Sequence, residues 1–365
     1  MNRRLRPASI ASLWLLSAAT GACMAAPPQD EIMGDDFEGF EYPTCDGALA
    51  SDDSDPKHYA AAMDLCSVVT QQSGKAGLIA ATLTLADGSG TPASASHAIR
   101  AQFGAANTPL RGSAMAMLST GHAAAQGQTN PAFFSPQVGS QNGTSSAQPA
   151  DWLTANGGVP PTAPGCPSLV SGSAFDPVML TLTLRVPGAA HSFRVGVNFY
   201  SADYPEFVCS PYNDEFVALL DSVFDGAPAN PPDRNLAQYF GPAAHTFPLG
   251  VNLSMNTGLF SQCVNGPTGC SSGAIAGMTT TCVSSGPLSG TGFDQANPPG
   301  GSCGANNLLG GGTGWLILRG NVTPGEVITL RLAIWDTSDG TYDSHVLLDD
   351  FHWSTQTVVP GVSVN

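Results

Sequence analysis

Residues 176–201 read DPVMLTLTLRVPGAAHSFRVGVNFYS, and this stretch decides the fold class. Within it, residues 176–187 and 191–201 each alternate apolar with polar side chains. Such alternation is typical of strands that have one buried and one solvated face. The segment Gly188-Ala189-Ala190 lies between the two runs and has the composition of a turn. The stretch therefore predicts a hairpin of two antiparallel strands.

Similar β-rich patterns continue on both sides of this stretch. We expect further strands within residues 77–87, 206–220, 314–319, 327–336 and 345–353. Their polar faces, and the turns that link them in place of crossover helices, favour antiparallel sheets. The fold class predicted from the sequence is therefore mainly β: an antiparallel β-sandwich with long disulfide-rich loops and one or two short helices.

Helices and loops are predicted from a different spacing. Residues 57–72 carry apolar side chains close to helical spacing and follow Asp55-Pro56, a pair typical of a helix start, so they predict one short amphipathic helix. Residues 94–103 and 113–118 are read as minor helices. Long loops are expected in the two stretches with little to bury, residues 121–167 and residues 225–312.

The first 25 residues have the features of a signal peptide. Three arginines among the first six residues precede an apolar run at residues 10–22, which is too short to span a bilayer as a helix. Two processing routes stay open: lipidation of Cys23, which follows Thr20-Gly21-Ala22, or ordinary cleavage near residue 25. The predicted organisation is a signal peptide (1–25), an acidic leader arm (26–56), one β-sandwich domain (57–355) and a C-terminal tail (356–365).

The cysteine count points to an oxidising compartment. Apart from Cys23 the chain holds an even set of eight cysteines, which favours disulfides. They are Cys45, Cys66, Cys166, Cys209, Cys263, Cys270, Cys282 and Cys303. The pairing is not fixed by the sequence, although nearness suggests Cys45 with Cys66 and a local cluster among the last four. No C-x-x-C pair occurs, so a zinc site is not expected.

The negative net charge of the chain argues against anionic partners. The chain has 12 Lys and Arg against 28 Asp and Glu, a net charge of −16. Without the three arginines of the signal peptide, nine basic residues remain, and the net charge becomes −19. Such a surface repels phosphate backbones, which argues against nucleic-acid binding and against anionic membrane surfaces. Divalent cations suit it better.

An acidic turn near the end of the chain predicts a calcium site. Asp336, Asp339 and Asp343 lie on an Asp- and Gly-rich turn, and Asp349 follows within the next strand as an outside ligand. Hard divalent ions prefer several carboxylate and carbonyl oxygens that a turn brings together. The spacing is not that of an EF-hand. An ordinary Asp- and Gly-rich hairpin explains the same residues, so both interpretations stay open.

A second segment mixes carboxylates with aromatic rings. Asp203, Tyr204, Tyr212 and Asp214 could bind a sugar, since the rings would stack on it and the acids would accept hydrogen bonds from its hydroxyl groups. The alternative is a strand pair whose rings are core and whose acids face water. A glycosidase could also use paired carboxylates such as Asp203 and Glu206, but nothing in the sequence tells an acid from a base.

No catalytic or nucleotide-binding residues are predicted. Residues 269–273 match G-x-S-x-G, but they lie in a Cys-rich loop without the strand and helix that make such a serine reactive. The seven histidines form no metal-binding motif, and the glycine-rich loops lack the Lys and Ser/Thr of a phosphate loop.

Three segments carry a resemblance to a known family. Residues 57–87, 199–216 and 313–351 together look like the choice-of-anchor L domain of bacterial surface proteins, the third segment being the most specific. The resemblance implies an exported β-sandwich of jelly-roll type, attached to the cell by whichever anchor its host chain carries, and no catalytic residues. Since the sequence ends without a sorting motif, the expected anchor is a lipid on Cys23.

Together these features predict an exported, non-catalytic module, secreted or on the cell surface, that serves adhesion, binding or envelope structure. An outer-membrane lipoprotein is one form of it. The alternatives are a carbohydrate-binding module and, third, a secreted hydrolase. The expected partner is a surface protein or a glycan, with no nucleic acid and with membrane contact only through the lipid. The one cofactor that the sequence indicates is calcium.

Overall fold

The computed structural model describes residues 43–169, 172–241, 245–255, 257–270, 279–295, 303 and 309–364. These residues belong to one compact unit, which runs from Asp36 to Asn365. The predicted signal peptide, Cys23 and the first part of the leader arm lie outside the described residues.

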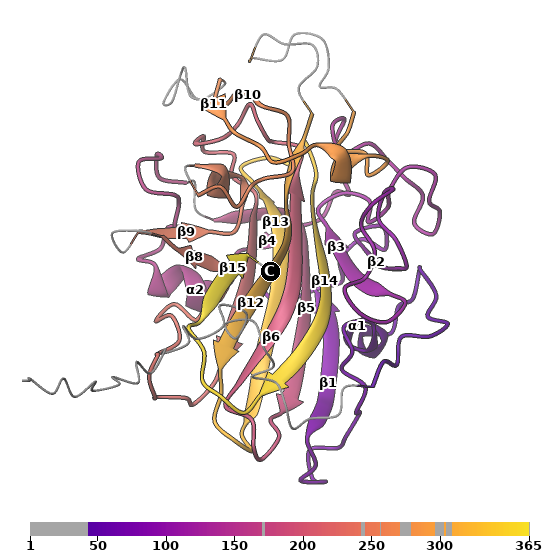
Figure 1. Cartoon of the computed structure of the whole chain (residues 1–365), viewed down its shortest axis with the longest axis vertical. Coiled ribbons are helices and arrows are strands. Elements are labelled where there is room, and N and C mark those ends of the chain that lie inside the picture. Colours follow the sequence, from indigo (N-terminus) through magenta and orange to yellow (C-terminus); the bar gives the residue numbers. More distant parts are fainter. Residues whose placement is uncertain are drawn as a thin grey trace, which may run out of the picture. The chain divides into compact units, whose positions relative to one another are not determined.

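Two antiparallel sheets build the molecule (Figure 1). The first sheet consists of β1 (Gly77–Thr84), β4 (Ser145–Ala147), β5 (Ser173–Arg185), β7 (Glu215–Asp221) and β13 (Val327–Thr337). The second consists of β2 (His97–Arg100), β3 (Met115–Ser119), β6 (Ser192–Ser201), β12 (Gly311–Asn321), β14 (Ser344–Ser354) and β15 (Gly361–Val364). The strand orders are β1-β5-β13-β7, with β4 on β5, and β15-β12-β6-β14-β3-β2. The prediction of a mainly β, antiparallel sandwich is confirmed.

Short elements lie outside the two sheets. The helices are α1 (Pro56–Ala62) and α2 (Ala150–Ala155), and the 3-10 turns are η3 (Val251–Ser254) and η4 (Gly286–Leu288). Two small ribbons pair β8 (Gln238–Phe240) with β9 (Thr246–Pro248) and β10 (Gly266–Pro267) with β11 (Thr279–Thr280). No helix in the described residues has both the length and the apolar character that a membrane span requires.

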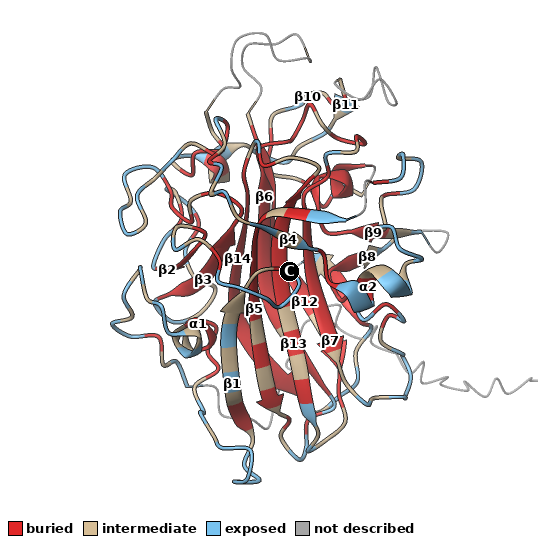
Figure 2. Ribbon diagram, turned by 180° about the vertical axis from the view of Figure 1, so that it is seen from behind, coloured by how far each residue is buried: buried red, intermediate tan, exposed pale blue. Residues whose placement is uncertain are grey.

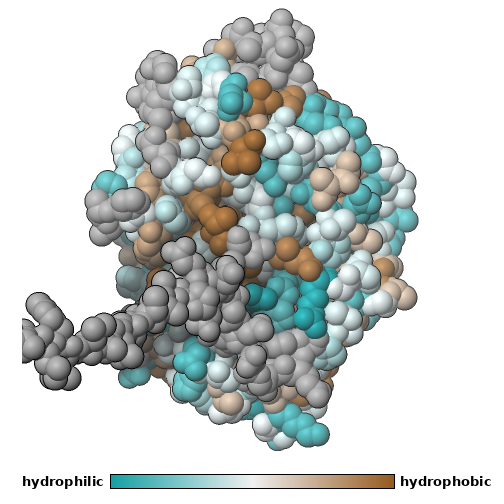
Figure 3. Space-filling view, in the orientation of Figure 1, coloured by the Kyte–Doolittle hydropathy of each residue, from teal (hydrophilic) through white to brown (hydrophobic). Residues whose placement is uncertain are grey.

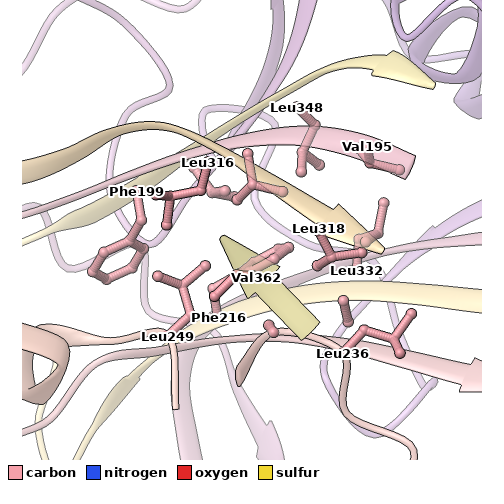
Figure 4. Close-up of a cluster of buried hydrophobic side chains, with 14 of the residues drawn as sticks. Val195, Phe199, Phe216, Leu236, Leu249, Leu316, Leu318, Leu332, Leu348 and Val362 are labelled. Carbon is pink, nitrogen blue, oxygen red and sulfur yellow. The ribbon is translucent and has the colours of Figure 1, made fainter. Parts of the chain in front are cut away.

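The main core lies between the two sheets, and period-two alternation explains its composition. Alternate residues of β5 and β13 from one sheet, and of β6, β12 and β14 from the other, point inward and form one buried cluster. Figure 4 shows part of it, including Val195, Phe199, Phe216, Leu316, Leu332 and Leu348. Each such side chain contributes about 1.5–3 kcal/mol by leaving water.

The predicted hairpin of residues 176–201 is wrong. β5 pairs with β1 and β13, whereas β6 pairs with β12 and β14, so the two strands lie in different sheets. The connection through Gly188 crosses from one sheet to the other. Both strands keep the predicted alternation, because each has one face in the shared core. Alternation followed by a turn fits this crossing as well as it fits a hairpin.

The predicted minor helices are also wrong. Residues 97–100 and 115–119 form β2 and β3, which pair with each other. Every residue of both strands is buried, so the alternation that would mark a strand is missing. The helix predicted within residues 57–72 exists but is short: Asp55 caps it by accepting a hydrogen bond from the Lys57 amide, and α1 ends at Ala62.

The outer face of the first sheet is partly open. In Figure 2, buried and intermediate residues alternate along the open ends of β5 and β13, and most of β1 is intermediate or exposed. Farther along the sheet α2 covers this face, and Trp152 packs edge-on against Trp335 with ring centroids 5.6 Å apart. On the face seen in Figure 3, the apolar residues that are visible form small separate groups.

All eight predicted disulfide cysteines are paired. The pairs are Cys45–Cys66, Cys166–Cys209, Cys263–Cys282 and Cys270–Cys303. The first is the pair that nearness along the chain suggested, and the last two lie within the expected local cluster. Such pairing is characteristic of an oxidising compartment.

Candidate functional site

Four aspartates meet at one end of the sandwich, between the two sheets. Asp214 and Asp336 belong to the first sheet, one just before β7 and the other near the end of β13. Asp203 follows β6, and Asp343 precedes β14, in the second sheet. Their exposed fractions are only 3%, 2%, 1% and 0% for Asp203, Asp214, Asp336 and Asp343. We call this group the carboxyl cluster.

Strand alternation explains why two of these side chains point inward. Along β13, Leu332 and Ile334 face the main core, and Asp336 continues the same face. Along β7, Phe216 faces the core, so Asp214, two residues earlier, faces inward as well. Asp336 and Asp214 each occupy the next inward-facing position after apolar core residues, so both carboxyl groups lie between the sheets.

Loops complete the cluster and supply hydrogen-bond donors. The Ser140 amide and hydroxyl donate to Asp343 over 3.0 and 3.2 Å. The Ser344 hydroxyl and the Thr337 amide donate to Asp214 over 2.6 and 3.2 Å. These donors fix the positions of two of the four carboxyl groups.

Asp336 is buried, and its two carboxyl oxygens make no hydrogen bond of ordinary geometry. Two polar groups lie next to it: the Thr120 hydroxyl lowers the pKa of Asp336 by hydrogen bonding, and the Asp336 carboxyl group lowers the pKa of Asp214 in the same way. Buried polar groups are almost always hydrogen-bonded. The Thr120 hydroxyl and the Asp214 carboxyl group are therefore the polar neighbours that Asp336 depends on in this site.

Gly121 makes close approach to the cluster possible. A β-carbon at this position would overlap the Asp343 carboxyl group and press on the Ser140 hydroxyl. Only glycine lets the backbone pass here without moving Asp343.

Burial raises the pKa of all four carboxyl groups, and nearby carboxylates add to the effect. The pKa of Asp214 rises to about 6 and that of Asp343 to about 8, in both cases mainly by desolvation. The pKa values of Asp203 and Asp336 lie well above the usual range for the same reason. No Lys or Arg side chain is among the principal influences, and none of the ion pairs found in the described residues includes these four.

The structure unites two sites that the sequence presented as separate. Asp336 and Asp343 come from the predicted calcium site, and Asp203 and Asp214 come from the predicted sugar site. Asp339 lies beside the cluster, half-buried, and its carboxyl group accepts a hydrogen bond from the Thr341 amide.

Asp349 lies elsewhere. It is opposite Gly196 in the middle of the second sheet, and its carboxyl group accepts hydrogen bonds from the Leu110 and Arg111 amides. In the described residues, no group of three or more His, Cys, Asp or Glu side chains is arranged to hold a metal ion.

Of the predicted sugar-binding rings, one reaches the surface. Tyr204 is buried and packs on Phe260 with ring centroids 4.8 Å apart. Tyr212 is 39% exposed and meets the edge of Phe207, which in turn contacts Tyr342. These three partly exposed rings form a small aromatic group beside the carboxyl cluster. The sequence pointed to Tyr212 alone.

The residues considered for hydrolysis are poorly accessible. Asp203 and Glu206 are 3% and 4% exposed. In the G-x-S-x-G segment, Cys270 forms a disulfide with Cys303, and Ser271 lies outside the described residues.

Sequence reasoning missed the polar residues that surround the carboxyl cluster. Gly121 and Ser140 lie in the predicted loop of residues 121–167, and Thr120 lies between that loop and the minor helix predicted at residues 113–118. No local signal marks them, because their importance comes from strands that are distant in the chain. Ser344 could have been found, since it is two residues before the inward-facing Val346 of β14.

Comparison of the chain with protein-family models, with curated proteins and with solved structures gives no match.

Proposed function

We propose that this protein is an exported, non-catalytic β-sandwich module, secreted or held at the cell surface, that serves adhesion, binding or envelope structure. The observation that carries the proposal is the closure of all eight cysteines on a sandwich of two antiparallel sheets. Disulfides form and persist outside the reducing cytosol. Membership of the choice-of-anchor L family, suggested by three sequence segments, belongs to the same proposal.

The burial of the acidic residues supports a non-catalytic role. A glycosidase needs two carboxyl groups on either side of an accessible bond. Asp203 and Glu206 are almost inaccessible, so a polymeric substrate could not approach them without opening the structure.

Fractionation tests the exported location. Cells that produce the full chain are separated into cytoplasm, membrane and external fractions, and the mature N-terminus is identified by mass spectrometry. We expect a protein that lacks the first residues and begins either near residue 25 or at an acylated Cys23. Recovery of intact chains from the cytoplasm would contradict the proposal.

Pull-down on envelope material tests the binding role. The purified mature protein is mixed with intact cells, with isolated cell walls and with outer-membrane vesicles of its host. Saturable binding to one of these surfaces is expected, without turnover of any glycan or peptide substrate. A specific hydrolytic activity that is lost in Glu206→Gln would instead assign the protein to the hydrolases.

A carbohydrate-binding module is the second candidate, and the aromatic group of Phe207, Tyr212 and Tyr342 favours it. Partly exposed rings beside acidic side chains can stack on sugar faces. A glycan array compares the native protein with Tyr212→Ala and with Phe240→Ala, which removes a similarly exposed ring that is not part of this group. Sugar binding that only Tyr212→Ala abolishes would establish this function.

A further inference from the structure

We propose that residues 286–295 form a strap that opens in acid, and that protonation of His345 releases it. The strap contains η4 and covers the face of the second sheet that points away from the main core. This inference concerns a movement within the fold and is independent of the cellular role proposed above.

The first reason is a second apolar core that the strap closes. Met117 of β3, Tyr200 of β6 and Leu347 of β14 belong to a buried cluster that is separate from the main core. The strap contributes Leu288 and Phe293 to this cluster, and both side chains are fully buried. The Phe293 ring stacks on the Tyr200 ring with centroids 5.5 Å apart. Opening of the strap would therefore expose an apolar surface on the second sheet.

The second reason is the way in which the strap is fastened. Its Ser289 carbonyl accepts a hydrogen bond from the Ala105 amide over 2.7 Å, and its Gly290 carbonyl accepts one from the Gln126 amide over 3.0 Å. The Gln126 side chain also donates to the Asp294 carboxyl group over 2.7 Å. Ala105 and Gln126 lie in loops, so releasing these bonds leaves the hydrogen bonds of the sheets intact.

The third reason is the position of His345 beneath the strap. The side chain is fully buried, and neither ring nitrogen has a hydrogen-bond partner within the described residues. Its ring meets Phe293 and Phe103 edge-on, with centroids 4.9 and 5.6 Å away. A protonated imidazole carries two N–H donors, and burying them without acceptors is costly. The closed strap therefore requires a neutral His345.

The oxygen groups nearest to His345 along the strands are already engaged. Tyr200, which lies opposite His345 in the sheet, donates its hydroxyl proton to the Asn107 side chain over 2.7 Å. Asp343, two residues before His345, accepts hydrogen bonds from the Ser140 amide and hydroxyl over 3.0 and 3.2 Å.

The charged groups around His345 also disfavour a proton on its ring. Burial lowers the pKa of His345 to about 3, and the positive charges of His122 and Arg100 act in the same direction. Asp294 is the one titratable side chain in the strap itself, and its carboxyl group accepts hydrogen bonds from the Gly290 and Gly292 amides.

The direction of the pH effect follows from these neighbours. When the strap is open, His345 is in water and its pKa returns to about 6.5. The closed strap is therefore fully favoured above pH 6.5. As the pH falls from 6.5 towards 3, His345 is protonated in the open form but stays neutral in the closed form, and opening becomes about tenfold more frequent for each pH unit.

Hydrogen exchange measured by mass spectrometry tests the proposal on the full mature chain, with its disulfides intact until the exchange is quenched. Exchange rates at pH 7.5, 6.0 and 4.5 are divided by the intrinsic rate at each pH to give the frequency of opening. Between pH 7.5 and pH 4.5 we expect opening of residues 288–295 to increase about a hundredfold. The amides of β13 should stay far better protected than the strap at every pH.

Four variants identify the group that is responsible. His345→Phe keeps a ring of similar size that takes up no proton, so the increase in acid should disappear. His345→Leu is a second variant of the same kind, for use if His345→Phe does not fold. The controls are Asp294→Asn and His122→Gln, which remove the acid of the strap and the neighbouring imidazole. Both controls should keep the increase.

Three results would overturn the proposal. The first is a strap whose opening does not change between pH 7.5 and pH 4.5, or one that opens equally in acid without His345. The second is an increase that is lost in folded Asp294→Asn or His122→Gln, because another group would then be the trigger. The third is exchange of the strap and of β13 at the same rate in acid, which would mean that the whole chain unfolds together.

Discussion

Gly121 sets how closely the backbone can approach the Asp343 carboxyl group, and a single methyl group tests this contact. In Gly121→Ala the new β-carbon would overlap the carboxyl group, so Asp343 or the loop must move. We expect a loss of about 1–3 kcal/mol in the free energy of unfolding, measured with urea. Gly188→Ala is the control, because a β-carbon there meets no atom within 4 Å and should change stability little.

His97 makes part of the stability depend on pH. Burial lowers the pKa of His97 to about 4, below its usual value near 6.5. The Tyr59 hydroxyl donates to the Asp53 carbonyl, so the neutral His97 must donate its Nδ1 proton to the Tyr59 oxygen over 2.6 Å. The stabilisation that neutral His97 provides is complete above pH 6.5. It is lost as the pH falls from 6.5 towards 4, because His97 becomes protonated in the unfolded chain but stays neutral in the folded chain over this range.

His97→Gln tests this dependence while it keeps a hydrogen-bond donor. Between pH 7 and pH 4.5 the native protein should lose about 2 kcal/mol more stability than the variant. Urea unfolding at both pH values measures the difference. Parallel losses in the two proteins would show that His97 does not titrate between these values.

At this scale the sequence reveals some of the cluster and hides the rest. Asp214 and Asp336 are each two residues from an inward-facing apolar residue, so alternation places both between the sheets. That Asp203 and Asp343 join them depends on β6 and β14 being neighbours, which no local pattern states. The nearness of Thr120 to Asp336 depends on side-chain geometry and needs the structure.

Among the elements, β2 holds its neighbouring loop through one arginine. The Arg100 guanidinium is buried and donates to the backbone carbonyls of Ala123, Thr129 and Pro131. A lysine cannot reach three carbonyl groups in that fixed arrangement. Arg100→Lys should therefore lower the free energy of unfolding by about 2–4 kcal/mol, since buried carbonyl groups would be left unpaired.

Limited proteolysis checks the same variant locally. Cleavage within residues 121–131 should become faster in Arg100→Lys than in the native chain. Arg185→Lys is the control, because Arg185 is partly exposed and its bonds go to the Gln71 and Gly325 carbonyls. If both variants behave like the native protein, Arg100 does not hold the loop.

The types of most long elements could be predicted, but the pairing of strands could not. The alternation in β5 and β6 identifies two strands, yet it is the same whether they share a sheet or face each other across a core. β2 and β3 were mistaken for helices because burial on both faces removes alternation. The short helix α1 was found because Asp55-Pro56 marks its start with a local signal.

At the scale of the whole molecule, each disulfide should stabilise the fold by an amount that depends on the number of residues between its two cysteines. Cys166 and Cys209 are 43 residues apart, and Cys263 and Cys282 are 19 apart. The loss of entropy in the unfolded chain is larger for the longer loop. Replacing the first pair by serine should cost about 4 kcal/mol, and replacing the second about 3 kcal/mol.

Urea unfolding of the two double variants measures this order. In the native chain none of these eight cysteines should react with a thiol reagent until the protein has been denatured and its disulfides reduced. An order of stability opposite to the expected one would mean that local packing, and not loop closure, dominates the contribution of each bond.

The order of the strands along the chain also determines how much of it must be synthesised before the sheets can form. Thr183 of β5 lies opposite Thr329 of β13, and Val195 of β6 lies opposite Leu318 of β12. These partners of β5 and β6 are therefore synthesised more than 100 residues later. Pairings between such distant residues form slowly, since a long loop must close first. A chain that stops at residue 310 should therefore lack cooperative unfolding and be digested quickly. Until β12, β13 and β14 have been synthesised, the unfinished chain therefore stays exposed to proteases and to aggregation with other copies of itself.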